Sequence, residues 1–360
     1  MTRGGDVPSR NPRGTLVARS LVGAWRPSPP GPELSAKELV EVAPLLLGSG
    51  AGALGWWRVR RSDLRSSAPA LALRDAYRLF ALHVALHECA IERAFVLLRS
   101  AGVEPILVKG WAIARHYPEP GLRPYGDLDL CVRPGQYVRA QEVLRGLEEE
   151  HVPVDLHAGF TNLDERDLDD LYAHSELVKL GDVPVRVLGP EDHLRVLCVH
   201  LLRHGAWRPL WLCDIAAAVE FRPADFDWDR CLGSKRRLAD WVVCSIGLAH
   251  ELLGSRVDET PVAERARHLP RWLVPNVLGQ WNTPFPTCQA PMRYPEPMAT
   301  YLRRPAGVLQ ALRMRWPNAI EATIGVKGPL NGLPRLPFRL AYCLLRTVRF
   351  VGRLPRLLQK

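Results

Sequence analysis

The sequence predicts an α+β fold in which a helical N-terminal segment, a small core of strands and helices, and a helical C-terminal domain follow one another. Three observations support this prediction. Residues 35–102 repeat apolar residues at the spacing of an α-helix. Residues 103–189 contain short apolar or alternating runs typical of strands, separated by glycine and proline. The helical spacing then returns at Pro190.

The composition of the remaining segments sets the outer boundaries. The first residues are rich in Arg, Pro and Gly and lack the continuous apolar run of a signal peptide. Proline recurs between 284 and 297, which is typical of a linker. We therefore expect a disordered leader (1–34), a helical N-terminal region (35–102), an α/β core (103–189), a helical domain (190–282), a Pro-rich linker (283–299) and a basic, partly helical tail (300–360).

Each element of this plan has a local reason. The long Ala- and Leu-rich run before Gly102 predicts one helix that stops at that glycine. In the core, "VEPILVKG", "DLDLCV" and "HVPVDLHAGF" predict three strands, and "SELVKLGDVPVRVL" predicts a hairpin around Gly181-Asp182. "WAIARHY" and "PGQYVRAQEVLRGLEEE" predict the helices between them. Beyond Pro190, helices are expected at 190–205, 209–221 and 239–254.

Charge and cysteine content restrict the class of protein. The formal net charge is +10, yet residues 303–360 carry twelve basic residues and one acid, Glu321. The basic character therefore lies in the tail. No apolar run reaches the roughly 18 residues that a membrane span requires. The eight cysteines lack C-x-x-C spacing and mostly sit among apolar residues, so we expect buried thiols in a cytoplasmic protein. The bias toward Arg over Lys suggests a GC-rich bacterial genome.

Two aspartates stand inside an otherwise apolar strand. Asp127 and Asp129 are two residues apart, so in a strand both would point to one face, about 6.5–7 Å apart along the chain. Two unpaired carboxylates on a buried strand repel each other and lose hydration. A pair of Mg²⁺ ions would relieve this cost, and Asp155 on a neighbouring strand could supply a third carboxylate. The alternative is that these acids face solvent on an exposed edge or cap a turn.

Nearby residues favour the metal interpretation. Lys109 ends the preceding strand, where its ammonium could reach a polyphosphate. Gly110 opens a helix, whose first amide groups favour an anion. Arg123 lies four residues before Asp127, in a turn that could fold over the same cleft.

These residues resemble a known family. "KGWAIARHYPEPGLRPYGDLDLCV", followed by "VDLHAGF" and "HLRVLCVHLLRHG…LWLCDIAAAVE", is similar to the uncharacterised nucleotidyltransferase family, which belongs to the polymerase-beta-type nucleotidyltransferase superfamily. The resemblance covers about residues 35 to 256. It implies a small mixed sheet with flanking helices, followed by a helical domain that closes over the nucleotide. It also implies transfer of an NMP from an NTP, with two Mg²⁺ ions as cofactors.

The resemblance also assigns roles by position. Asp127 and Asp129 would hold both metal ions, and Asp155 would bind one of them and assist the base. Lys109 and Gly110 would take the place of the superfamily's Gly-Ser phosphate loop, although Trp111 stands where a serine is expected. Arg123 would face phosphate.

Other polar and aromatic residues admit several interpretations. His193, His200 and His204 share one face of a predicted helix; zinc binding, contact with nucleotide or acceptor, and plain packing are all open, and His200 is our candidate nucleotide contact. His157 shares a face with Asp155, either supporting the metal site or simply packing. Asp214 could cap a helix, pair with an arginine or contact substrate. Four tryptophans at 56, 57, 207 and 211 fit a core better than base stacking.

The sequence thus predicts a Mg²⁺-dependent nucleotidyltransferase that moves an NMP from an NTP to a hydroxyl or similar group of a small molecule or modified peptide. One alternative is transfer to RNA or protein, with the basic tail as docking surface; the other is a degenerate fold that serves as a binding module. The tail's arginines could bind an acidic partner, RNA or a membrane surface, or its helices could pack on the body with the arginines outward.

Overall fold

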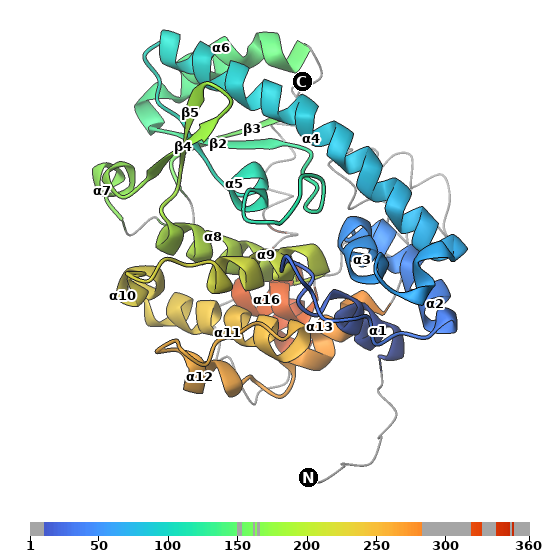
Figure 1. Cartoon of the computed structure of the whole chain (residues 1–360). Helices are drawn as coiled ribbons and strands as arrows, with labels where there is room; N and C mark the ends of the chain where they lie inside the picture. The colour runs from blue at the N-terminus through green and yellow to red at the C-terminus, as the bar shows by residue number, and fades with distance from the viewer. Residues whose placement is uncertain are drawn as a thin grey trace, which may run out of the picture.

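The computed structural model confirms the α+β fold class, with a five-stranded sheet between layers of helices (Figure 1). It describes residues 11–149, 153–160, 163, 166–282, 318–325, 336–345 and 348.

The sheet is mixed, as the family resemblance implies. Its strand order is β3-β2-β1-β5-β4, in which β1 is antiparallel to β2 but parallel to β5, and β2 is parallel to β3. The predicted hairpin is present: β4 and β5 are antiparallel and Gly181 in the turn has φ 53°. The strands are β1 (Ile106–Leu107), β2 (Leu128–Val132), β3 (Val154–Ala158), β4 (Glu176–Leu180) and β5 (Val183–Val187).

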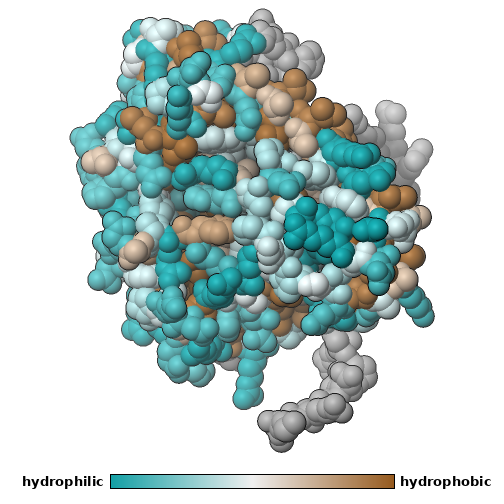
Figure 2. Space-filling model, viewed as in Figure 1, coloured by the Kyte–Doolittle hydropathy of each residue, from teal (hydrophilic) through white to brown (hydrophobic). Residues whose placement is uncertain are grey.

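Two helices cover one face of the sheet. α4 (Ala68–Ser100) contacts β5 and α6 (Tyr137–Glu149), and α6 contacts β3. Leu128 and Leu130 of β2 point into the core between these layers, where Phe95 and Leu98 of α4 are fully buried. Elsewhere α4 exposes apolar residues to solvent, and Figure 2 shows apolar patches on an otherwise mostly hydrophilic face.

The opposite face of the sheet carries a smaller cluster. Cys131 of β2 packs there with Leu171 of α7 (Leu168–Ala173) and Val196 of α8 (Pro190–Arg203). Strand residues two apart share a face, so this is also the face to which Asp129 points. The carboxylates that the sequence singles out therefore face the helical domain and not α4.

The largest core joins the N-terminal helices to the helical domain. Leu39, Leu54, Leu201, Ile215 and Trp241 all belong to it. The helices that contribute most of its residues are α1 (Pro12–Leu21), α2 (Ala36–Gly48), α3 (Gly52–Val59), α8, α9 (Pro209–Glu220), α11 (Arg236–Leu253) and α13 (Leu273–Trp281). The remaining elements are η1 (Asp63–Ser66), α5 (Gly110–Ala114), η2 (Pro134–Gln136), α10 (Trp228–Leu232), α12 (Ala263–Arg267) and α16 (Ala319–Gly325).

The prediction of a disordered leader at 1–34 is wrong from residue 11 onward. α1 begins at Pro12, and Val17, Leu21 and Trp25 are completely buried in the largest core. Arg26 then forms an ion pair with Glu220 of α9 at 2.5 Å. An Arg- and Pro-rich composition hides this short apolar stripe, whose burial supplies the free energy that orders the segment.

The predicted linker at 283–299 and most of the basic tail lie outside the described residues. Within the tail, α16 packs against α8 and buries Ile320, Ala322 and Thr323. Residues 336–345 are helical, and their Leu336, Leu340 and Leu344 are exposed. In the part of the chain that the structure describes, no helix is long and apolar enough to cross a membrane.

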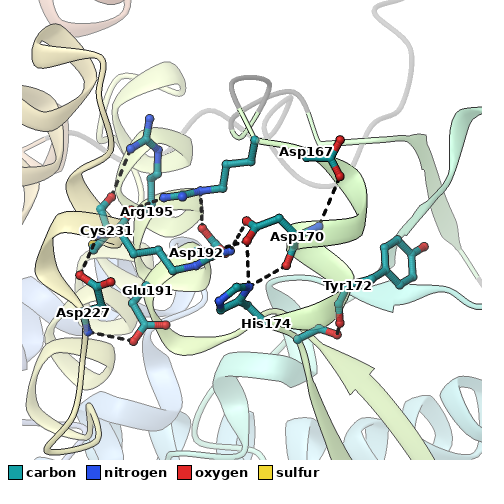
Figure 3. A network of polar contacts seen from close by, with 12 residues as sticks. Asp167, Asp170, Tyr172, His174, Glu191, Asp192, Arg195, Asp227 and Cys231 are labelled. Carbon is teal, nitrogen blue, oxygen red and sulfur yellow. Dashed lines mark hydrogen bonds and ion pairs between the residues drawn. The ribbon is translucent and has the colours of Figure 1, made fainter.

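A buried ionic network ties α7, α8 and α10 together (Figure 3). Asp192 of α8, of which 1% is exposed, forms ion pairs with Arg166 at 2.7 Å and with Arg230 at 2.6 Å. Arg230 also contacts Asp170, which pairs with His174. Asp192 thus binds both arginines and shares Arg230 with Asp170, and the network holds α7, α8 and α10 together.

Candidate metal centre and nucleotide site

The register of β2 and β3 brings two of the predicted carboxylates together. Asp129 and Asp155 are direct partners in this parallel pair. Because partners in neighbouring strands project to the same face, their side chains lie side by side. Asp127 precedes the first residue of β2 and is exposed at its end. The predicted convergence is therefore present for Asp129 and Asp155, with Asp127 at the rim.

His157 joins this pair more closely than Asp127 does. Its Nε2 lies 3.1 Å from Asp155 Oδ2 and 3.7 Å from Asp129 Oδ1. The ligand atoms of Asp129, Asp155 and His157 all lie within 4.8 Å of one another, which is a spacing that could hold a metal ion. Asp129 is buried, whereas the side chains of Asp155 and His157 are 40% and 38% exposed, so the group opens to solvent on one side.

The electrostatics of the group show strong coupling. Hydrogen bonds to Asp129 and Asp155 raise the pKa of His157 to about 9, and the same His157 contact lowers the pKa of Asp155. Loss of hydration and the neighbouring charge of Asp129 raise the pKa of Asp127. Three carboxylates thus face two cations, His157 and Lys109. Two carboxylates and an imidazole are a donor set that fits a divalent ion, and binding through His157 would require that this ring lose its proton.

Lys109 points at the same group. Its Nζ lies 2.5 Å from Asp129 Oδ1. Its backbone has φ 55° and Gly110 follows with φ 43°, so the turn between β1 and α5 adopts a conformation that non-glycine residues rarely take. The strand ending at this lysine and the strand carrying Asp129 are antiparallel neighbours, which explains the meeting of their side chains.

Trp111, which stands in place of the expected serine, faces away from the carboxylates. Its side chain belongs to the core between the sheet and α4, and its indole N–H donates to Glu88 Oε1 of α4 at 3.1 Å. The helix that it belongs to, α5, has only five residues. Trp111 therefore anchors the short helix to α4, and the predicted anion-binding helix start at Gly110 is weaker than the sequence suggested.

Arg123 does not take the orientation that we predicted. It is buried and donates through Nε and Nη2 to the two carboxylate oxygens of Asp214, at 3.0 and 2.7 Å. Tyr117 donates to the same carboxylate at 2.9 Å. Of the interpretations open for Asp214, pairing with an arginine is the one observed. The Arg123–Asp214 ion pair fastens the loop that leads into Asp127 to α9, and it leaves the charge of Arg123 close enough to lower the pKa of Asp127.

His200 lies in the same region of the molecule. Burial and the charge of Lys109 hold its pKa well below the ordinary value, so its ring is neutral. The structure does not support zinc binding by these histidines, because among the described residues the one group with metal-binding geometry is Asp129, Asp155 and His157. His193, about two turns earlier, is buried, and its pKa falls to about 3 for the same reason of burial.

Sequence reasoning gave too little weight to two features of the site. His157 bridges both carboxylates, and its position two residues after Asp155 was the available signal. Trp207 and Trp211, which we assigned to the core, are only half-buried. Trp211 lies beside His200 and His204, and Trp207 lies against Trp211. Nothing in the local sequence distinguishes a half-buried tryptophan from a buried one.

Comparison with known proteins identifies the class of protein. The model of a family described as uncharacterised nucleotidyltransferases matches residues 52–254, which is more than half of the chain. The chain therefore belongs to this nucleotidyltransferase family, as its motifs suggested, and the matched segment includes the sheet, the carboxylate group and α8 to α11. No curated protein and no solved structure matches the chain.

Proposed function

We propose that the protein is a Mg²⁺-dependent nucleotidyltransferase that moves an NMP from an NTP to a hydroxyl or similar group of a small molecule or modified peptide. One observation carries the proposal: in a chain of this family, Asp129 and Asp155 stand side by side on neighbouring strands with Lys109 against them. A buried acid with a structural role, such as Asp192, is paired with arginines, whereas Asp129 and Asp155 contact a lysine and a histidine.

In this proposal Asp127, Asp129 and Asp155 hold two Mg²⁺ ions. When bound, the ions supply positive charge to the α-phosphate and to the departing pyrophosphate. Lys109 exchanges its contact with Asp129 for the triphosphate, which needs only a rotation of its long side chain. For Asp129 and Asp155 to hold a cation, His157 would have to give up its proton or turn aside.

The remaining steps belong to the chain's own residues. The acceptor oxygen attacks the α-phosphorus, a new P–O bond forms, and the bond from that phosphorus to the bridging oxygen breaks as pyrophosphate leaves. Asp155 is half-exposed and its pKa is lowered, so at neutral pH it is a carboxylate that can orient the acceptor hydroxyl and accept its proton. The Arg123–Asp214 ion pair holds the loop before Asp127 in place without touching phosphate.

Labelled nucleotides test this proposal directly. Each of the four α-³²P NTPs is incubated with Mg²⁺, cell extract and either the wild-type protein or the Asp129→Asn variant. We expect label to appear on an acceptor with the wild-type protein only, and the labelled fraction then identifies the acceptor as small molecule, peptide, RNA or protein. Label on RNA or protein would overturn our choice of acceptor. Tight binding of Mg-NTP without transfer to any fraction would overturn the enzyme and favour the degenerate binding module.

A further inference from the structure

Four rings gather where α8 ends and α9 begins. His200 and His204 are 4.4 Å apart by ring centroids, and Trp211 lies 4.5 Å from His200 and 5.3 Å from His204. Trp207 adds an edge contact to Trp211 at 5.4 Å. We call these four residues the ring cluster. His204 is exposed, and the other three are half-buried, so the cluster has an open side.

The ring cluster lies beside the carboxylate group. α9 packs against α5, the helix that directly follows Lys109. Asp214 of α9 reaches Arg123 and Tyr117 on the core, and Trp211 is one helical turn earlier on the same side of α9. In addition, the charge of Lys109 lowers the pKa of His204 and the charge of Asp129 raises it. These facts place the rings close to Lys109, where the phosphates of a bound nucleotide would lie.

Arg208 and the largest core support the ring cluster. Arg208 donates to the carbonyl oxygen of Ser49, at the end of α2, at 2.9 Å, and its guanidinium lies 5.6 Å from the centre of the Trp211 ring. Trp211 also packs against the largest core. A fixed set of aromatic rings with one open side is suited to stacking on a flat ligand, because little side-chain entropy is lost on binding.

We propose that the ring cluster is the nucleobase-binding surface of the enzyme, on which the base of the NTP stacks against Trp211 and His204. This inference rests on the proposed function, since it takes the phosphates to lie at Lys109. Base–aromatic stacking contributes about 1–3 kcal/mol per base, which corresponds to roughly five- to 150-fold in affinity. The neutral imidazole of His200 offers one donor and one acceptor for the edge of the base.

Two probes that differ only by the nucleoside separate this surface from the phosphate site. The dissociation constants of Mg-ATP and of Mg-tripolyphosphate are measured by calorimetry for the wild type and for the Trp211→Leu and His204→Ala variants. Trp228→Leu is the matched control, because Trp228 is also half-buried but lies on α10 against Phe226. His204→Ala changes an exposed side chain, so it tests the surface even if Trp211→Leu unfolds.

We expect both cluster variants to weaken Mg-ATP binding by about tenfold while binding of Mg-tripolyphosphate changes less than twofold. The control variant should bind both probes like the wild type. Wild-type binding of Mg-ATP that neither cluster variant weakens would overturn the base-binding surface alone. Failure of the wild type to bind either probe would overturn the proposed function, and the surface with it.

Discussion

Two acidic groups in this protein contrast in how their charges are balanced. Asp192 is buried against Arg166 and Arg230, and with Asp170 it forms a network of two carboxylates and two arginines that links three helices (Figure 3). Asp129 is also buried, but it shares its space with Asp155 and Asp127, and the nearby cations are a flexible lysine and a titrating histidine.

The difference separates a structural role from a functional one. Arginine cannot lose its charge in a protein and matches a carboxylate with two parallel hydrogen bonds, so acids that it saturates stay closed to other ligands. Lysine and histidine can be displaced, and an excess of carboxylates at a half-exposed strand end attracts a divalent cation. Arginine saturation therefore predicts which of the buried acids hold the fold and which bind a ligand.

The largest expected effect is on catalysis at Asp129. The Asp129→Asn substitution should lower the rate of NMP transfer by on the order of 10³-fold, because it removes a metal-binding carboxylate at the reacting phosphate. The free energy of unfolding should fall less than in Asp192→Asn, because removing this carboxylate also removes its repulsion of Asp127, and Lys109 keeps Asp155 and Asp127 as charged neighbours. Initial rates with α-labelled NTP and urea unfolding measure the two quantities. Asp75→Asn, on the exposed surface of α4, serves as control.

The reverse pattern is expected at Asp192. The Asp192→Asn substitution leaves two buried arginines without their shared carboxylate and should lower the free energy of unfolding by about 3–5 kcal/mol. The transfer rate per folded molecule should stay within about twofold of wild type. If the Asp192→Asn protein unfolds like wild type but loses activity, the division between the two groups is wrong.

Acid should weaken the fold through buried histidines that belong to neither acidic group. Burial lowers the pKa of His193 to about 3 and of His116 to about 4, whereas an unfolded histidine titrates near 6.5. As the pH falls through about 6.5, the unfolded chain takes up protons that the folded protein refuses, so stability declines from there toward the folded pKa values. We expect a loss of about 1–3 kcal/mol between pH 6.5 and 5, measured by urea unfolding.

Two variants check the source of this acid effect. His116→Gln should flatten the dependence of stability on pH, because glutamine does not titrate. His268→Gln should leave it unchanged, since that ring is exposed to solvent. Equal slopes in wild type and His116→Gln would assign the acid sensitivity to other groups.

The smallest effect is expected at an exposed ion pair on the sheet side of the ionic network. Arg133 and Asp169 are 2.6 Å apart, with side chains 36% and 83% exposed. The Asp169→Asn substitution should change the free energy of unfolding by less than about 1 kcal/mol, because solvent screens the pair. A loss comparable to that of Asp192→Asn would show that burial is not what distinguishes structural acids here.

Much of the sheet and part of the site could be predicted because the signals are local. The alternation in "DLDLCV" assigns Leu128 and Leu130 to the core and Asp129 to the other face, and the structure has this arrangement. The proximity of Asp129 and Asp155 could be predicted because each lies in a predicted strand and the two strands are neighbours in the sheet. The burial of Trp111 is also expected from its residue type, because a large apolar side chain packs into the core where the family motif has serine.

The rest depends on distant contacts that local sequence does not encode. Arg123 meets Asp214 across 91 residues, so its turn toward α9 and away from phosphate could not be read from the Arg-x-x-x-Asp-x-Asp spacing. The order of residues 11–34 depends on Trp25 and Leu21 entering a core built mainly by later helices. The open side of Trp211 likewise depends on how α8, α9 and the sheet are placed.

Direct observation of divalent ion binding tests the central claim, that Asp129 and Asp155 form a metal centre while arginine-saturated acids do not. Mn²⁺ can replace Mg²⁺ at oxygen-rich sites, and its magnetic resonance signal reports the free ion during a titration. We predict that wild type and Asp192→Asn bind Mn²⁺ alike in the presence of NTP, and that Asp129→Asn and Asp155→Asn each bind at least tenfold more weakly. Equal Mn²⁺ binding by all four proteins would contradict this account.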